Sequence, residues 1–333
     1  MTIKDIAKEC GCAIGTVSRV LNNHPDVSDK TREKVMAVVE KYGFVLNANA
    51  KQLKSQERKN LVIIVKGTSS TLLNGLLERI QKMLEPLPYT ASVVILDEHD
   101  NEGFNATRIY FEQKPLGIIF LGGSPDRLAG EFEKVHVPSV LISNNAEKIS
   151  SQFLSSVSID NLEASYYSAK HLIDKGHKNI GVIGGSLDSS LSTIRYTGFR
   201  KAMYEAGLNF DFDTSYQESK YSFEGGSEAV KKLLAKNPKI TAIFSMSDAM
   251  AIGACRKLKD LNYKVPEDIS IIGFDGITLA DYFCPRLTTI KQNEDELAKV
   301  GLNVLIDCIE KHAEPCHRII PFEFKEGESV KTL

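Results

Sequence analysis

The sequence has no apolar run long enough to cross a bilayer, and it is poor in cysteine. A transmembrane helix needs about 20 consecutive apolar residues, whereas runs such as "LVIIV" and "SVVIL" are much shorter. Six cysteines spread over 333 residues suit free thiols in a reducing compartment. The first residues, "MTIKDIAKECG", place charges where a secretory signal needs an apolar core. We therefore expect a cytoplasmic protein with no membrane segment.

The motifs of common enzymes built on α/β folds are also absent. The sequence has no Gly-x-Gly-x-x-Gly after its first apolar run, no phosphate-binding loop and no Gly-x-Ser-x-Gly elbow. Cys10, Cys12 and His24 would need further ligands at closer spacing to hold a metal ion. The carboxyl terminus has no heptad repeat, so the sequence predicts no coiled coil there. These absences argue against catalysis, a cofactor and a metal.

The charge is distributed unevenly along the chain. Residues 1–60 contain eleven Lys and Arg against seven Asp and Glu, whereas the remaining residues contain 30 against 36. The overall net charge of -2 therefore hides a basic segment attached to a mildly acidic body. That distribution indicates contact with a polyanion at one end. A chance fluctuation in composition would give the same imbalance, so charge alone leaves both interpretations open.

The first sixty residues have the apolar spacing of helices only. One helix is predicted over Ile3–Cys10, with Gly11 placed to end it, and a second, shorter one over Thr16–Leu21. After "NNHPD", Ser28 can cap a third helix. Two short helices joined by a tight turn that contains glycine, followed by a third, indicate a helix-turn-helix.

The remainder of the chain alternates short apolar runs with amphipathic segments of helical length. The polar and basic stretch "NANAKQLKSQERKN" separates it from the first helices and is predicted to be a linker. The runs from "LVIIV" to "ISIIGF" are continuous rather than alternating, as expected for parallel strands covered on both faces. About 270 residues of this pattern predict two doubly wound subdomains, with a ligand crevice at the carboxyl ends of their strands.

Several blocks carry a resemblance to a known family. They begin with "TIKDIAKECG" and "GTVSRVLN" and continue with "VSDKTREKV", "NANAKQL", "HLIDKGHKNIGVIGG", "RYTGFRKAM", "SDAMAIGA", "ISIIGFDG" and "PRLTTIKQ". In order and spacing, from about residue 2 to residue 322, the chain resembles the LacI/GalR family of bacterial transcription regulators. The resemblance implies an all-α helix-turn-helix headpiece and an α/β core of two doubly wound parallel-sheet subdomains, similar to periplasmic binding proteins.

The resemblance also implies a division of the chain. The expected segments are a headpiece over 1–46, a hinge helix or linker over 47–60, and a core for effector binding and dimerisation over 61–333. Within the core, the expected N-subdomain is about 61–160 plus 291–320, and the expected C-subdomain about 161–290 plus 321–333.

The headpiece is expected to contact double-stranded DNA in two ways. By the resemblance, Ile14, Gly15 and Arg19 face base edges in the major groove, where Arg19 can donate two hydrogen bonds to a guanine. Ala13 lacks the hydroxyl that usually caps this helix. The alternative is that Arg19 is an ordinary surface residue of a small helical domain. The residues expected at phosphates are Thr16, Ser18, Asn22, Ser28, Thr31 and Arg32.

The linker is expected to fold into a short hinge helix on DNA. The resemblance implies that Leu53 wedges into the minor groove and kinks the duplex, that Ala50 permits close approach, and that Asn47 and Lys51 contact the DNA backbone. The family's usual proline is Leu46 here, which removes a natural helix start. The alternative is a tether without regular structure.

A small-molecule site is expected between the two core subdomains. The resemblance implies that Arg195 donates to ligand hydroxyls or a carboxylate, that Asp275 accepts from sugar hydroxyls and that Tyr221 stacks on a pyranose. The alternative for Asp275 is a turn residue at the end of a strand. The other lining residues implied are Ser69, Leu72, Ser143 and Ser247. These four are smaller and less charged than the contacts of a typical monosaccharide site, so a larger glycoside, a nucleobase or no small ligand stays open.

The implied function is that of a homodimeric repressor of transcription. It would bind a pseudo-palindromic operator with an affinity switched by a small molecule, most simply a carbohydrate. Two other interpretations stay open: a sugar-binding protein of transporter type without a DNA role, and a catabolite-control-type regulator that uses a protein corepressor. Activation in place of repression is open as well.

Overall fold

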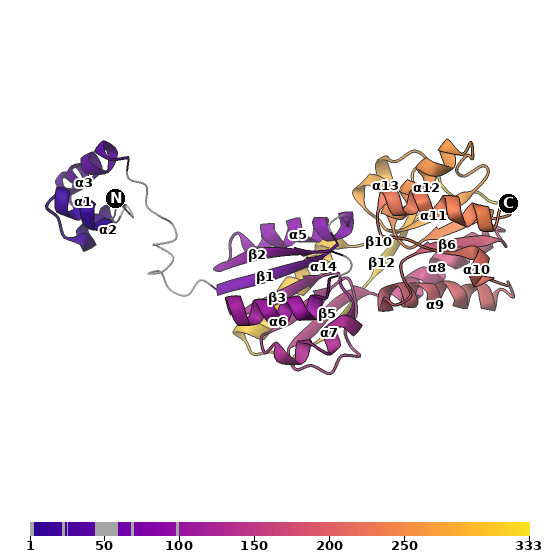
Figure 1. Cartoon of the computed structure of the whole chain (residues 1–333), viewed down its shortest axis with the longest axis horizontal. Coiled ribbons are helices and arrows are strands. Elements are labelled where there is room, and N and C mark those ends of the chain that lie inside the picture. Colours follow the sequence, from indigo (N-terminus) through magenta and orange to yellow (C-terminus); the bar gives the residue numbers. More distant parts are fainter. Residues whose placement is uncertain (1–2, 22–23, 25, 44–58, 68–69, 98–99) are drawn as a thin grey trace. The chain divides into compact units, whose positions relative to one another are not determined.

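A computed structural model describes residues 3–21, 24, 26–43, 59–67, 70–97 and 100–333. The chain divides into two compact units, residues 1–58 and residues 59–333. The first unit contains the helices α1 (Ile3–Glu9), α2 (Ile14–Leu21) and α3 (Asp29–Lys41) (Figure 1). None of the described helices combines the length and the apolar character that a bilayer crossing requires.

The three helices of the first unit enclose a small apolar core. Gly11 ends α1 with a φ of +59°, a left-handed conformation that glycine adopts without steric cost. Val17 and Val20 lie three residues apart on α2 and therefore share its inner face. The predicted helix-turn-helix is confirmed. The buried residues of its core are Ile6, Ala7, Cys10, Val17, Val20 and Val35.

The second unit begins with a six-stranded sheet, here called the N-lobe sheet, whose strand order is β2-β1-β3-β4-β5-β11. All of its neighbouring strands are parallel. The strands are β1 (Lys59–Lys66), β2 (Tyr89–Leu96), β3 (Gly117–Leu121), β4 (Ser139–Ile142), β5 (Leu154–Ile159) and β11 (His317–Ile320).

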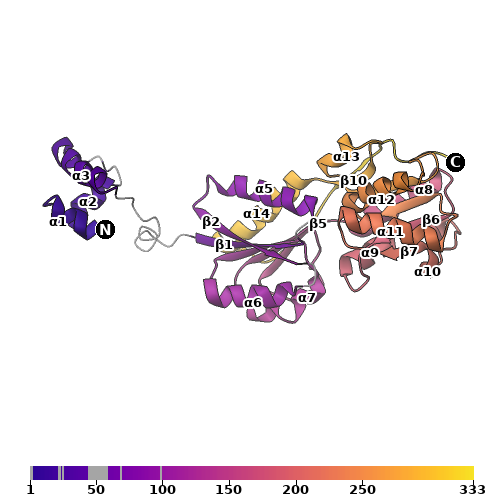
Figure 2. The same ribbon diagram turned by 45° about the horizontal axis from the view of Figure 1, so that its top comes forward.

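Helices cover both faces of the N-lobe sheet (Figure 2). Alternate residues of β1 point to opposite faces, so Leu61 and Ile63 belong to one buried cluster and Val62 and Ile64 to another. A strand buried on both sides has to be apolar throughout, which explains the uninterrupted run "LVIIV". The helices are α5 (Thr71–Leu84) and α14 (Glu294–Glu310) on one face, with α6 (Glu102–Gln113) and α7 (Pro125–Ala129) on the other. The 3-10 turn η1 (Phe132–Lys134) lies on the second face, because Phe132 belongs to the same buried cluster as Val62.

The C-lobe is built on a second six-stranded sheet of order β12-β10-β9-β8-β6-β7. Its strands are β6 (Ile180–Gly184), β7 (Tyr216–Glu218), β8 (Ala242–Ser245), β9 (Ser270–Asp275), β10 (Thr288–Gln292) and β12 (Phe322–Lys325). Two doubly wound sheets were predicted and are confirmed. One strand differs from the prediction, because β12 is antiparallel to β10.

Two close helix pairs flank the C-lobe sheet. On one side, α8 and α9 approach so closely that a Cβ on Gly198 would lie 2.1 Å from the carbonyl oxygen of Leu162. Gly253 has the same role between α12 and α11, where a Cβ would lie 1.9 Å from the Phe223 carbonyl oxygen. The helices of this lobe are α8 (Asn161–Asp174), α9 (Ser190–Glu205), α10 (Phe212–Ser215), α11 (Phe223–Lys236), α12 (Asp248–Asp260) and α13 (Thr278–Tyr282).

The chain passes between the two lobes three times. We call these passages crossover 1 (159–161, from β5 to α8), crossover 2 (292–294, from β10 to α14) and crossover 3 (320–322, from β11 to β12). Each begins in a strand of one sheet and leads into an element of the other lobe. Any change in the relative orientation of the lobes therefore has to be absorbed at these short segments.

Candidate functional site

Helix α2 has one buried face and one exposed face. Val17 and Val20 are 0% and 3% exposed and hold the helix on the headpiece core. Ile14, at 44% exposure, and the side chain of Arg19, at 62%, lie on the outside with Gly15. The residues expected to face base edges thus share one solvent-facing side of a helix, as a groove-reading helix requires.

Arg19 has a partner that the sequence did not suggest. Its Nη1 lies 3.1 Å from Oδ2 of Asp26, while Nδ1 of His24 lies 3.0 Å from Oδ1 of the same carboxylate. Both the arginine and the aspartate are largely exposed. An exposed pair of this kind contributes at most about 1 kcal/mol, so a base that offers two acceptors can replace it.

The residues expected at phosphates lie on α2 and at the start of α3. Thr16, Ser18, Thr31 and Arg32 are half-buried, and Arg32 Nη2 donates to the carbonyl oxygen of His24 at 2.7 Å. Ser28 precedes α3 but its hydroxyl does not cap the helix backbone as expected. It lies instead 2.9 Å from Oγ1 of Thr31.

Several predicted positions lie outside the described residues. For the DNA interface these are Asn22 in the headpiece and residues 47–58 of the predicted hinge, and for the effector site it is Ser69. Lys59 and Asn60, the last two residues of the predicted hinge segment, instead begin β1. The predicted hinge contacts concerned are Asn47, Ala50, Lys51 and Leu53.

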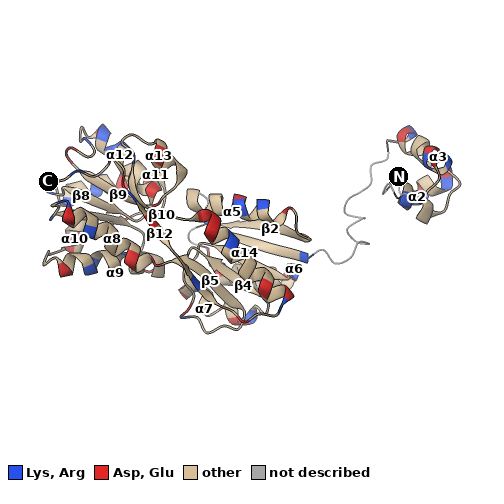
Figure 3. Cartoon of the chain, turned by 180° about the vertical axis from the view of Figure 1, so that it is seen from behind, with Lys and Arg blue, Asp and Glu red and all other residues tan. Residues whose placement is uncertain are grey.

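The basic character of the amino-terminal segment is concentrated after the three helices. Residues 44–60 contain four Lys and Arg against one Asp or Glu, whereas residues 1–43 contain seven against six. Figure 3 shows acidic and basic residues interspersed on the headpiece helices. The excess of positive charge therefore belongs mainly to the segment expected to contact the DNA backbone next to the headpiece.

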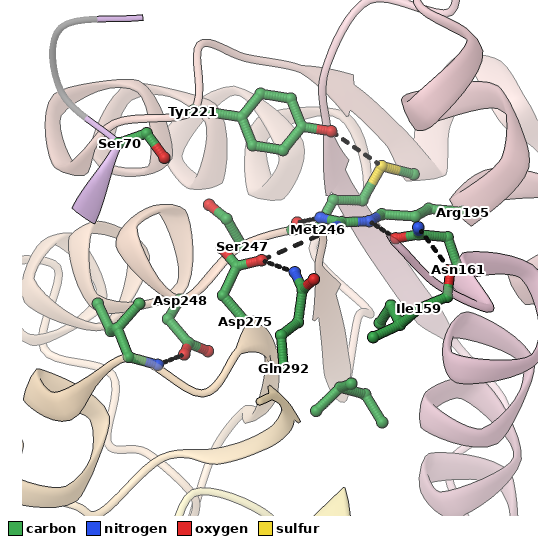
Figure 4. A network of polar contacts seen from close by, with 12 residues as sticks. Ser70, Ile159, Asn161, Arg195, Tyr221, Met246, Ser247, Asp248, Asp275 and Gln292 are labelled. Atoms are coloured by element: carbon green, nitrogen blue, oxygen red, sulfur yellow. Dashed lines mark hydrogen bonds and ion pairs between the residues drawn. The ribbon is translucent and has the colours of Figure 1, made fainter. Parts of the chain in front are cut away.

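Arg195 lies at the centre of a buried polar network in the C-lobe (Figure 4). It projects from α9 and is 3% exposed. Its Nε donates to Oδ1 of Asn161 at 2.9 Å, its Nη1 donates to the carbonyl oxygen of Met246, and its Nη2 lies 3.7 Å from Oδ1 of Asp275. The guanidinium stacks 3.7 Å from the ring centroid of Phe274, a geometry that favours a desolvated cation.

Asp275 ends β9 in an unusual conformation. Its φ is +116°, a strained value for a residue with a side chain and one often found at functional sites. Gln292 Nε2 donates to its Oδ1 at 2.9 Å. Burial raises the pKa of Asp275 to about 6, against the opposing effect of the Arg195 charge. Burial thus favours the protonated form of this carboxyl, whereas the Arg195 charge favours the ionised form.

A second carboxyl, Asp248, is buried next to this network. Its Oδ1 accepts from Oγ1 of Thr289 at 2.6 Å, and its Oδ2 accepts from the backbone N–H of Ile277 at 2.9 Å. Burial raises the pKa of Asp248 well above the usual range, and the nearby Asp275 adds to that effect. Asp248 thus fixes the start of α12 against β10 and the turn after β9.

Tyr221 and Ser247 are the other two predicted effector contacts on the C-lobe. Tyr221 Oη lies 3.1 Å from Oγ of Ser192 and 3.9 Å from the sulfur of Met246. Ser247 caps α12, because its Oγ accepts from the backbone N–H of Met250 at 3.2 Å. Figure 4 shows Tyr221, Ser247 and Ser70 bordering one region above the Arg195–Asp275 pair.

The described N-lobe contacts are buried, as are Arg195, Ser247 and Asp275 in the C-lobe. Leu72 in the first turn of α5 is 6% exposed and belongs to the hydrophobic core. Ser143 follows β4 at 5% exposure, and its backbone N–H donates to the carbonyl oxygen of Val157 at 2.9 Å. The described neighbour of Ser69, Ser70, caps α5 by accepting from the N–H of Leu73.

Three residues of the network were missed from the sequence. Asn161, Asp248 and Gln292 are buried and polar. Asn161 and Asp248 come two and three positions after the ends of β5 and β8, in "SVSIDN" and "AIFSMSD", and Gln292 is the last residue of β10 in "TTIKQ". Polar residues just after apolar runs mark strand ends, and the carboxyl ends of parallel strands converge on the ligand crevice. That signal was available, but it does not distinguish a site residue from an ordinary turn.

Comparison with known proteins gives a consistent result. Residues 2–47 match the model of bacterial regulatory proteins of the lacI family, and residues 169–330 match that of the periplasmic binding protein-like domain. The HTH-type transcriptional regulator MalR of Clostridium butyricum is 36% identical over 99% of both chains.

Solved structures that match almost the whole chain include a sugar complex and an operator complex. The complex of the transcriptional regulator CelR with cellobiose is 25% identical, with a TM-score of 0.73 over 99% of both chains. The Lac repressor dimer bound to operator and the anti-inducer ONPF has a TM-score of 0.77 over 99% of both chains, at 22% identity. At this low identity, the similarity to the Lac repressor dimer concerns the fold alone.

Proposed function

The chain belongs to the lacI family of bacterial regulatory proteins, and we propose on this premise that it is a homodimeric repressor whose operator affinity is switched by a carbohydrate. Its general role is that of a DNA-binding regulator of transcription. The observation that carries the DNA-binding proposal is the exposed face of α2, which presents Ile14, Gly15 and Arg19 while Val17 and Val20 are buried.

We assign base readout mainly to Arg19. Its guanidinium can donate two hydrogen bonds to guanine O6 and N7, which contributes about 1–3 kcal/mol of discrimination. Ile14 offers only an apolar contact and Gly15 no side chain. The residues proposed to hold the DNA backbone or the central step are Thr16, Ser18, Asn22, Thr31, Arg32, Asn47, Ala50, Lys51 and Leu53.

We assign effector binding to the region around Arg195 and Asp275. A sugar hydroxyl can donate to the carboxylate while accepting from a cation, and the Tyr221 ring offers an apolar face. The cellobiose bound by CelR supports a carbohydrate in preference to a nucleobase. The further lining residues proposed are Ser69, Leu72, Ser143 and Ser247.

The dimer and the cellular location follow from the same role. A two-fold symmetric dimer places two copies of α2 on the two halves of a pseudo-palindromic site. The operator-bound Lac repressor, a dimer of the same fold, supports this assembly. A regulator of this kind acts on chromosomal DNA in the bacterial cytoplasm, and we propose no catalytic activity for it.

Selection of bound DNA from a random pool tests the proposal. We expect enrichment of an inverted repeat, with binding that weakens steeply as salt rises because phosphate contacts release counterions. The Val17→Asp variant is the matched control, since an unpaired carboxylate in the headpiece core should abolish enrichment. The proposal is overturned if the wild-type chain enriches no sequence or binds without dependence on salt.

A further inference from the structure

Two polar side chains lie at the passages between the lobes. Asn161 begins α8 at the end of crossover 1, and Gln292 ends β10 at the start of crossover 2. They are 5% and 1% exposed. Buried amides at such positions carry donors and acceptors that need partners, so their contacts indicate what the crossovers are attached to.

Asn161 connects the N-lobe sheet to Arg195. Its Nδ2 donates to the carbonyl oxygen of Ile159, the last residue of β5, at 3.3 Å. Its Oδ1 accepts from Arg195 Nε at 2.9 Å. The side chain thereby spans crossover 1 and ties it to α9 of the C-lobe.

Gln292 connects crossover 2 to Asp275. Its Nε2 donates to Oδ1 of Asp275 at 2.9 Å, while its Oε1 is buried with no partner among the described residues. Immediately beyond this crossover, Glu294 and Asp295 of α14 each lie 2.7 Å from the guanidinium of Arg79 on α5. The segment that follows Gln292 is therefore tied by ion pairs to α5, the first helix of the N-lobe.

We propose that Asn161 and Gln292 are positioning residues that join the Arg195–Asp275 pair to crossovers 1 and 2, so that a ligand bound at the pair acts directly on the lobe connections. The inference rests on the proposed effector site. A hydroxyl that donates to Asp275 or accepts from Arg195 changes the contacts available to Gln292 or Asn161. Because the network is buried and continuous, the two crossovers respond together.

Hydrogen exchange of the full chain without ligand tests this connection. Gln292→Leu should raise exchange of the amides of residues 160–164, at the other crossover, at least ten-fold, and Asn161→Ala should do the same for residues 293–297. The matched control is Asn237→Ala, which removes amide contacts to Asn179 and Ser215 within the C-lobe and should leave both segments within two-fold of the wild type.

Two further variants make the result specific. Asn161→Asp keeps the acceptor for Arg195 and removes the donor to Ile159, so it tests the link if the alanine variant does not fold. In an Arg195→Ala background, Gln292→Leu should produce no added change at residues 160–164, because the connection through Arg195 is already removed.

The inference is overturned if each variant alters exchange only at its own crossover. This experiment uses no ligand, so that outcome leaves the proposed effector site standing. Failure of the effector site would in turn appear as an operator affinity that no sugar changes.

Discussion

At the scale of single residues, the buried carboxyl of Asp275 predicts how the stability of the core depends on pH. Asp275 has a pKa raised to about 6 by burial, compared with about 3.9 for an aspartate in an unfolded chain. The native state therefore binds the proton more tightly than the unfolded state. This contribution to stability is fully present below about pH 4 and is lost as the pH rises through 6.

The pH prediction concerns the slope of stability between pH 5 and pH 7. In Asp275→Asn we expect the unfolding free energy to fall less steeply with rising pH than in the wild type, because the shifted proton is gone. Urea denaturation of the core at pH 5, 6 and 7 measures the slope. The exposed control Asp188→Asn should keep the wild-type slope. An unchanged slope in Asp275→Asn would show that this carboxyl does not take up the proton.

At the scale of elements, α2 is the helix that we propose reads the DNA sequence. Arg19→Ala should reduce discrimination at one base pair of each half-site between about five-fold and a hundred-fold, since the bidentate contact contributes about 1–3 kcal/mol. Competition binding with operators changed at single base pairs measures this. Arg32→Ala, a proposed phosphate contact, is the control and should weaken binding to all sequences alike. If Arg19→Ala behaves in the same uniform way, Arg19 holds phosphate and reads no base.

The elements also show what the sequence could predict. Continuous apolar runs identified the parallel strands, because a strand such as β1 is covered on both faces. The apolar spacing of α1 and α2 identified the headpiece. The antiparallel direction of β12 could not be predicted, because "FEFK" fits either direction and its pairing with β10 is a tertiary contact.

The proposed effector site could be predicted only in part, because several of its contacts are also tertiary contacts. The resemblance supplied Arg195 and Asp275, which the structure brings to 3.7 Å. Their partners Asn161 and Gln292 lie 34 and 17 positions away along the chain, and local patterns carry no information on such pairs. The Arg19–Asp26 pair was closer in sequence but depends on the turn between α2 and α3.

At the scale of the whole molecule, the DNA contacts and the effector contacts that we propose belong to separate compact units. Residues 44–58, the last of the first unit, contain Lys51, Lys54 and Arg58 against the single acid Glu57. A ligand in the core can change operator affinity only through a difference in its contacts between two states of the protein. We propose that such a difference first arises at the crossovers of the core.

The operator affinity of the full chain with and without sugar tests the central claim most directly. A duplex taken from the selection would be titrated in the presence of a panel of mono- and disaccharides that includes cellobiose. We predict that at least one sugar changes the wild-type affinity five-fold or more, whereas Arg195→Ala binds the same duplex within two-fold of the wild type and does not respond. An affinity that no sugar alters, or an Arg195→Ala protein that responds like the wild type, would contradict the account.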